Sequence, residues 1–159
     1  MKLKLLVLSD SHGSMRVMEE AVMTERPDLI VHLGDRIRDA ERLGEMFPQI
    51  PMLGVPGNCD YPAPGAELTL LRSIGGVTIL MTHGHLYHVK QSLLAAELAA
   101  REAGAQVLLF GHTHRTYCLE RDGLWMLNPG SCGYSRSYGL VNIEGGRTVC
   151  RLAEIQDGG

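Results

Sequence analysis

Short apolar runs alternate with segments of helical spacing over the first two thirds of the chain. The helical pattern is clear at 15–26, where three methionines and Val22 fall on one face and Pro27 ends the segment. A later segment rich in Ala and Leu is stopped by Gly104. The pattern predicts five strands, at 3–8, 29–33, 51–55, 77–81 and 107–110, and three helices, at 15–26, 39–46 and 89–103.

The last third of the chain shows no helical pattern and predicts consecutive β segments. Tight turns are expected at Asp122-Gly123 and at Gly145-Gly146. The expected strands are 116–121, 124–127, 138–143 and 147–154. We therefore predict one α/β domain over residues 1–156, in which a parallel βαβ core is followed by a β meander.

Composition and charge narrow the classes of function. The 159 residues fit one domain, and a hydrophobic content of 45% is typical of a globular protein. A net charge of −3, with no run of Lys or Arg, argues against an extended nucleic-acid groove. No apolar stretch approaches the roughly 18 residues of a membrane span, and the N-terminal run is too short for a signal peptide. The four cysteines form no CxxC pair and are expected to be reduced, so we expect a cytoplasmic protein without membrane association.

Polar clusters directly follow all five predicted strands of the first part of the chain. They are Ser9-Asp10-Ser11-His12-Gly13, Gly34-Asp35, Gly57-Asn58-Cys59-Asp60, Thr82-His83-Gly84-His85 and Gly111-His112-Thr113-His114. Because parallel strands of an open α/β sheet end at one edge, we expect these clusters to converge in space. Residues two apart in an extended segment point the same way, so Asp10 and His12, like His112 and His114, can face one site.

The residue types in these clusters indicate divalent metal ions. Imidazoles, carboxylates and one amide oxygen suit Mn, Fe, Zn, Ni or Co, whereas an all-oxygen set would indicate Mg or Ca. The candidate ligands are too many for one tetrahedral zinc but enough for two ions that share a carboxylate: Asp10, His12, Asp35, Asn58, His83, His112 and His114. We expect two divalent ions per chain, with manganese as the first choice, in the arrangement of two-metal hydrolases.

The order of these motifs resembles the calcineurin-like metallophosphoesterase superfamily, whose signature runs DxH, GD, GN(H/C)D, a downstream H and GHxH. The matching motifs extend from about residue 5 to residue 131, which is most of the chain. The compact length, Cys59 in the third motif and the later Asn128-Pro129-Gly130-Ser131 make the chain similar to the small bacterial and archaeal phosphodiesterases of the YfcE-like group.

The resemblance implies a four-layer α/β/β/α sandwich with mixed sheets. It assigns Asp10, His12 and His114 to one ion, Asn58, His83 and His112 to the other, and Asp35 to both. It further implies that a hydroxide held by the two ions attacks a small phosphodiester, with weak phosphomonoesterase activity in addition. Relatives in this group suggest a homodimer or a homotetramer.

Three more residues at the same edge are candidates for catalysis. Asp60 is expected to orient Asn58 or a neighbouring group. Many members of the superfamily carry His in place of Cys59, where it helps to protonate the leaving group. A thiol, with an ordinary pKa near 8.5, is a poorer proton donor. We therefore expect either a preference for esters with good leaving groups or another acid, for which His85 is the candidate.

Several alternatives remain open at this point. A protein-binding scaffold of the same fold, like the retromer subunit, would have a degraded metal site, whereas all the ligand positions here are intact. The HxHxDH motif of a metallo-β-lactamase-type hydrolase is absent. His32, inside a strand, is expected to be structural. The loop at 128–131 is either an ordinary turn or a border of the metal pocket.

Overall fold

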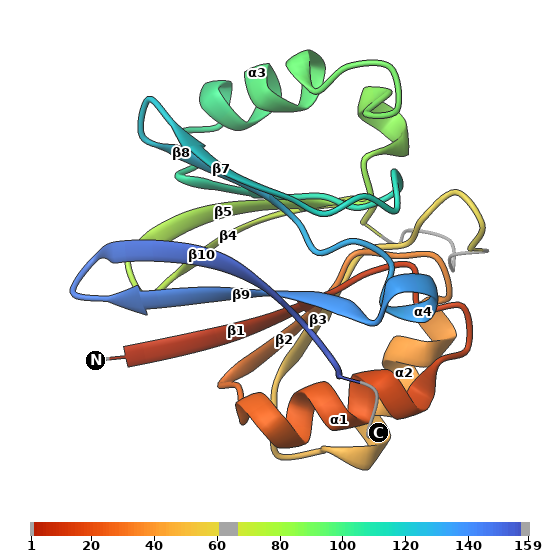
Figure 1. Ribbon diagram of the computed structural model, residues 1–159. Helices are drawn as coiled ribbons and strands as arrows, with labels where there is room; N and C mark the ends of the chain where they lie inside the picture. The colour runs from red at the N-terminus through yellow and green to blue at the C-terminus, as the bar shows by residue number, and fades with distance from the viewer. Residues whose placement is uncertain (1, 61–66, 157–159) are drawn as a thin grey trace.

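Two five-stranded sheets pack face to face, and helices cover the outer side of each sheet (Figure 1). The computed structural model describes residues 2–60 and 67–156. Helices α1 (Met15–Glu25) and α2 (Ile37–Met46) lie on the first sheet, and α3 (Leu94–Glu102) lies on the second. The predicted four-layer α/β/β/α sandwich with mixed sheets is therefore confirmed.

Both sheets combine parallel and antiparallel strands. The first has the order β10-β9-β1-β2-β3, in which β1 to β3 are parallel and β9 is antiparallel to β1. The second has the order β4-β5-β6-β8-β7, in which β5, β6 and β8 are parallel. The strands are β1 (Lys2–Leu8), β2 (Leu29–His32), β3 (Met52–Gly54), β4 (Thr69–Ile74), β5 (Val77–Thr82), β6 (Val107–Leu109), β7 (Tyr117–Arg121), β8 (Leu124–Asn128), β9 (Ser137–Glu144) and β10 (Arg147–Glu154).

Two short helical segments, η1 (His85–Tyr87) and α4 (Cys132–Ser135), complete the described elements. The longest described helix, α1, has 11 residues, whereas about 20 apolar residues are needed to span a bilayer. No helix in the described part of the chain can therefore cross a membrane.

The C-terminal third differs from the predicted meander. The turns at 122–123 and 145–146 close two hairpins as expected, but β7 and β8 join the second sheet, whereas β9 and β10 join the first. The chain passes from one sheet to the other through α4 (Figure 1). Turn residues specify a hairpin locally but carry no information on the sheet that receives it. The prediction of one continuous meander was wrong for this reason.

Two helix starts also differ from their predicted positions, because side chains outside the apolar pattern cap them. Oγ of Ser92 accepts a hydrogen bond from the N–H of Leu94 (3.1 Å), so α3 begins several residues after the predicted start at 89. The carboxylate of Asp60 accepts from the N–H groups of Arg36 (2.7 Å) and Ile37 (2.9 Å), so α2 begins before residue 39. Strand β4 and helix α4 were not predicted.

The position of β1 explains its continuous apolar run. Leu5 and Val7 pack between the two sheets, whereas Leu6 and Leu8 pack in the cluster that contains α1. All four side chains are fully buried. A strand that is covered on both faces needs apolar side chains at successive positions rather than alternate ones.

A chain of buried hydrogen bonds fixes the ends of β1 and β2. The N–H of Gly34 donates to Nδ1 of His32 (3.1 Å), so Nε2–H of His32 faces Oγ of Ser11 (3.0 Å). Ser11 donates in turn to the carboxylate of Asp39 (2.8 Å), which also accepts from the N–H of Gly13 (2.7 Å). Burial lowers the pKa of His32 to about 4, so the ring is neutral at pH 7. His32 thus has the structural surroundings expected from its place in a strand.

We predict that Leu5→Ala lowers the free energy of unfolding by about 2–5 kcal/mol, because it leaves a cavity between the sheets. The matched control Val149→Ala, at an exposed position of β10, should change it by less than about 0.5 kcal/mol. Urea unfolding followed by circular dichroism measures both values. A loss under about 1 kcal/mol for Leu5→Ala would contradict a tightly packed core around β1.

We predict a specific pH dependence for the contribution of His32. The native ring stays neutral down to about pH 4, whereas the unfolded chain takes up a proton near the ordinary pKa of 6.5. The depressed native pKa means that the stability contributed by His32 is lost as the pH falls from about 6.5 towards 4.

Over this range, the unfolding free energy of the metal-free wild type should fall relative to that of His32→Gln by roughly 2–3 kcal/mol. His88→Gln, on the exposed surface, is the matched control and should follow the wild type. A constant difference between the wild type and His32→Gln from pH 7 to pH 4 would contradict a buried neutral ring.

Candidate metal centre

The polar clusters that follow the strands lie together at one edge of both sheets. The N–H of Asp10 donates to the carbonyl of Gly34 (2.9 Å), which joins the ends of β1 and β2. The N–H of Gly111 donates to the carbonyl of His83 (2.8 Å), which joins the ends of β5 and β6. Nδ1–H of His83 donates to the carbonyl of Leu33 (2.7 Å) and connects the two sheets. The clusters therefore converge as expected, but from two sheets rather than one.

Four of the predicted ligands surround a common point. Each offers one ligand atom, and these atoms lie within 4.8 Å of one another: Asp10, His12, Asp35 and His114. Nε2 of His114 is 3.2 Å from Oδ1 of Asp10. This oxygen and Nε2 of His12 are buried without a hydrogen-bond partner among the described residues. Because unpaired buried polar atoms are costly, a metal ion bound by these side chains fits the site.

A second set of ligands lies beside Asp35. Nε2 of His83 is 3.5 Å from Oδ2 of Asp35 and 3.2 Å from Nδ1 of His112. Since the carbonyl of Leu33 holds Nδ1–H of His83, the lone pair of Nε2 in the neutral ring points towards Asp35. Asp35 thus lies between the first set and the two histidines.

Asn58 lies on the turn after β3, where it is exposed. The N–H of its neighbour Cys59 donates to Oδ1 of Asp35 (3.0 Å). The turn that carries Asn58 is therefore bound to the Asp35 carboxylate through Cys59.

Asp10, Asp35 and His83 form a buried charged group. Burial raises the pKa of Asp10, and the charge of His83 offsets this only in part. Burial also acts to raise the pKa of Asp35. Hydrogen bonds from His83 and Cys59, together with the charge of His83, nevertheless hold this pKa well below its usual range. Burial opposes a charged His83, yet Asp35 and Asp10 raise the pKa of this ring. In the metal-free site, His83 is therefore the cation that balances the carboxylates.

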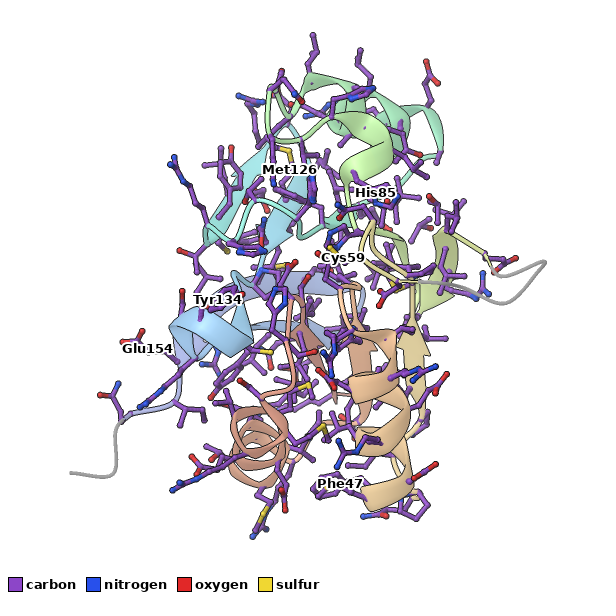
Figure 2. All side chains as sticks on the ribbon, turned by 90° about the vertical axis from the view of Figure 1, so that its right-hand side faces the viewer. Phe47, Cys59, His85, Met126, Tyr134 and Glu154 are labelled. Carbon is purple, nitrogen blue, oxygen red and sulfur yellow. The ribbon has the colours of Figure 1, made fainter. Side chains whose placement is uncertain are left out.

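Three groups around this centre are neutral near pH 7. Burial, then the charge of His83, lowers the pKa of His112 to about 4 and also lowers the pKa of His85. Burial, then the charge of Asp35, raises the pKa of the Cys59 thiol. The ring centroids of His83 and His85 are 5.5 Å apart, and Figure 2 shows Cys59 and His85 on the face where the two halves of the molecule meet. His85 is thus a neutral imidazole beside the centre.

Most of the predicted ligands sit on strained backbone. A positive φ is uncommon for residues other than glycine, and it costs on the order of 1–3 kcal/mol when the surroundings impose it. The ligands with this conformation are Asp10 (52°), His12 (47°), Asp35 (56°), His112 (71°) and His114 (62°). Such residues cluster at functional sites, where neighbouring contacts fix the loops.

Asp60 fixes two of these loops from outside the ligand set. Besides the start of α2, its carboxylate accepts from the N–H of Gly57 (2.8 Å). It therefore ties the turn that carries Asn58 to the segment that carries Asp35. Contacts of this kind fit the positioning role expected for Asp60.

The loop at 128–131 borders the centre and holds two more ligand loops. Nδ2 of Asn128 donates to the carbonyl of Gly111 (3.1 Å) and to Oγ1 of Thr113 (3.0 Å). Oγ of Ser131 donates to the carbonyl of Asp10 (2.7 Å). Of the two interpretations left open by the sequence, the border of the metal pocket is the one that the structure supports.

Three supporting residues escaped the sequence analysis. Oγ of Ser9 donates to Oδ2 of Asp10 (2.6 Å), and the ring of Tyr134, on α4, stacks on the ring of His12 (4.7 Å between centroids). The third is Asp39. The sequence could have indicated it, because an acidic residue in the first turn of a helix is a recognisable feature. Tyr134 follows the 128–131 loop by only three residues, but no pattern in the sequence indicates that its ring stacks on His12.

Comparison with known proteins places these observations in a family. A family model described as the calcineurin-like phosphoesterase superfamily domain matches residues 3–146. A probable metallophosphoesterase of Bacillus subtilis, YsnB, is 35% identical over 162 residues, which cover 94% of this chain and 90% of that protein. The phosphodiesterase YfcE of Escherichia coli K12 is 29% identical and aligned over 88% of each chain.

Two further proteins are similar to this chain, the first over part of its sequence and the second over nearly its whole fold. The vacuolar protein sorting-associated protein 29 of Schizosaccharomyces pombe is 42% identical over 99 residues, which cover 54% of this chain and 53% of that protein. The crystal structure of a predicted phosphoesterase from Streptococcus pneumoniae superposes with a TM-score of 0.81 and 27% identity, covering 97% of this chain and 90% of that one. The chain therefore belongs to the calcineurin-like phosphoesterase superfamily, a superfamily of metal-dependent phosphoesterases.

Proposed function

We propose that this protein is a phosphodiesterase that works with two divalent metal ions. The observation that carries the proposal is the group of four ligand atoms within 4.8 Å of one another, two of which are buried and have no hydrogen-bond partner within residues 2–60 and 67–156. His83 and His112 adjoin this group through Asp35 and supply ligands for a second ion. Asp35, Asp10, His12 and His114 would hold one ion, and Asp35, Asn58, His83 and His112 the other.

The ligand chemistry is compatible with manganese, which we propose as the first candidate ion. Mixed imidazole and carboxylate sites suit Mn, Fe, Co, Ni and Zn, and two bound ions provide an ionised water and offset charge on the phosphoryl group. His83 must lose its proton before Nε2 can bind a cation, so metal binding should release protons. Nδ1–H stays on the carbonyl of Leu33 throughout, which keeps the ring in one orientation.

A diester suits the electrostatics of the centre better than a monoester. A diester phosphate carries one negative charge, whereas an ionised monoester carries up to two. The side chains nearest the centre supply little extra positive charge, because His85 and His112 have lowered pKa values and Cys59 remains a thiol. The similarity to YfcE, which is named a phosphodiesterase, supports the same choice.

His85 is our candidate for the group that protonates the leaving oxygen, acting through the minor protonated fraction that its lowered pKa leaves near pH 7. Its ring lies 5.5 Å from that of His83 and 6.2 Å from that of His112, and its Nδ1 is buried without a partner in the described part of the chain. Cys59 is the weaker candidate, because burial, and then the charge of Asp35, raises the pKa of its thiol and keeps its proton bound.

The partial similarity to the vacuolar protein sorting-associated protein keeps a protein-binding scaffold as the second candidate. The enzyme is favoured because the complete set of ligands is present and because the strained backbone at five of them would serve no purpose in a scaffold.

We also propose that the protein acts in the cytoplasm, where thiols stay reduced. All four cysteines are free, including Cys118, whose Sγ donates to the carbonyl of Cys150 (3.3 Å) rather than forming a disulfide. The homodimer or homotetramer implied by the resemblance stays a prediction, which light scattering would measure.

We predict that Asp35→Asn weakens manganese binding by at least about 100-fold and reduces turnover to background, because one carboxylate serves both ions. Asp122→Asn, in the hairpin turn, is the matched control and should keep both properties. Calorimetric titration with Mn²⁺ and hydrolysis of bis(p-nitrophenyl) phosphate measure them. Full metal-dependent turnover by Asp35→Asn would remove the bridging role.

We predict that His85→Ala slows release of a poor leaving group far more than release of a good one. With thymidine 5′-phosphodiesters, kcat should fall about 100-fold for an alkoxide leaving group but only a few-fold for p-nitrophenolate, since general acid catalysis contributes about 10²–10⁴. His88→Ala is the matched control. Equal losses for both esters would exclude His85 as the acid, and a selective loss in Cys59→Ala would assign the acid to Cys59.

A further inference from the structure

A hollow of ≈ 500 Å³ lies beside the metal centre, between the segment before α3 and the connection from β6 to β7. About half of its wall is apolar, and this part includes Val89, Leu93, Phe110 and Tyr117. The rings of Phe110 and Tyr117 lie 6.1 Å apart between centroids. A wall of this kind can pack against the carbon skeleton or ring of an organic ligand.

The hollow and the metal centre share one loop. Thr113, which lines the hollow, lies in the sequence between the proposed ligands His112 and His114. Successive Cα atoms are about 3.8 Å apart, so the Cα atom of Thr113 lies at about that distance from the Cα atoms of both ligands. Nδ2 of Asn128 donates to Oγ1 of Thr113 and fixes the shared loop. The hollow therefore adjoins the loop that carries two of the proposed ligands.

Two cations give the hollow a positive potential. Lys90 and Arg115 line it, and neither forms an ion pair with any residue in the described ranges. By contrast, Arg101 and Arg121, near the opposite end of the same sheet, both pair with Glu97. Among the described residues that line the hollow none is acidic, although the whole chain has a net charge of −3.

We propose that the hollow binds the non-reacting arm of a phosphodiester substrate whose arm carries a second phosphate group. Lys90 and Arg115 would form charge-assisted hydrogen bonds with that phosphate, and the apolar wall would pack against the atoms between the two phosphates. The inference rests on the proposed phosphodiesterase function and names its substrate class.

The test compares two substrates that differ by one phosphate. Thymidine 5′-(p-nitrophenyl phosphate) and its 3′-phosphorylated derivative lose the same leaving group from the same kind of phosphorus. For the metal-loaded wild type, kcat/KM should be about tenfold higher for the phosphorylated derivative, which corresponds to about 1.4 kcal/mol of added binding. In Lys90→Gln/Arg115→Gln, the ratio of the two values should fall below about twofold.

A second double variant controls for net charge. Arg42→Gln/Arg147→Gln removes two exposed cations from α2 and β10, and it should keep the wild-type ratio. If the ratio of the two kcat/KM values also fell below about twofold in this control, the preference would come from the net charge of the protein rather than from the hollow. This result would overturn the proposal.

A binding measurement separates this proposal from the proposed function. In calorimetry, metal-free wild type should bind thymidine 3′,5′-bisphosphate about tenfold more tightly than Lys90→Gln/Arg115→Gln does. Equal binding by the two proteins, or equal kcat/KM of the wild type for the two substrates, overturns the subsite. If the loaded wild type hydrolyses neither ester, the phosphodiesterase function fails, and the binding measurement alone then decides the subsite.

Discussion

Two buried carboxylates, Asp10 and Asp35, set the constraint that the rest of this structure satisfies. Removing an ionised carboxylate from water costs several kcal/mol unless a positive charge compensates it. Asp10 is fully buried and Asp35 is 4% exposed, with His83 completely buried between the two sheets beside them. In the metal-free protein, His83 provides the compensating charge. Divalent ions would provide more of it, which is why this cluster is better explained as a metal centre than as a structural ion pair.

The fold serves this cluster by fixing the backbone of the ligand loops as well as several ligand side chains. The loops whose ligand residues have a positive φ are held by residues that are not ligands themselves. Asp60 caps α2, Ser131 binds the backbone of Asp10, and Asp39 binds the backbone of the loop after β1. Each contact joins segments that are distant in sequence. Because the strain of the ligand loops is offset by this outer layer, two of the candidate ligand atoms, Oδ1 of Asp10 and Nε2 of His12, can stay without a hydrogen-bond partner among the described residues.

The sequence predicted the site better than it predicted the topology, for a physical reason. Each ligand cluster follows its strand directly, so strand ends and ligands such as Asp10 and His83 could be found from local patterns. By contrast, the choice of sheet for the β9–β10 hairpin depends on packing against β1, which no local pattern contains. The start of α2 depends on Asp60, and the stacking on His12 depends on Tyr134; both contacts exist only after folding. The hollow at Lys90 and Arg115 was missed because its cations come from two separate loops.

If two cations share Asp35, crystals grown with Mn²⁺ should show two manganese peaks in anomalous diffraction. These peaks should lie about 3.5–4 Å apart with the Asp35 carboxylate between them. One peak should contact the first ligand set and the other the second: Asp10, His12 and His114 for the first, Asn58, His83 and His112 for the second. A single peak at full occupancy, or two peaks that do not both contact Asp35, would contradict this shared coordination.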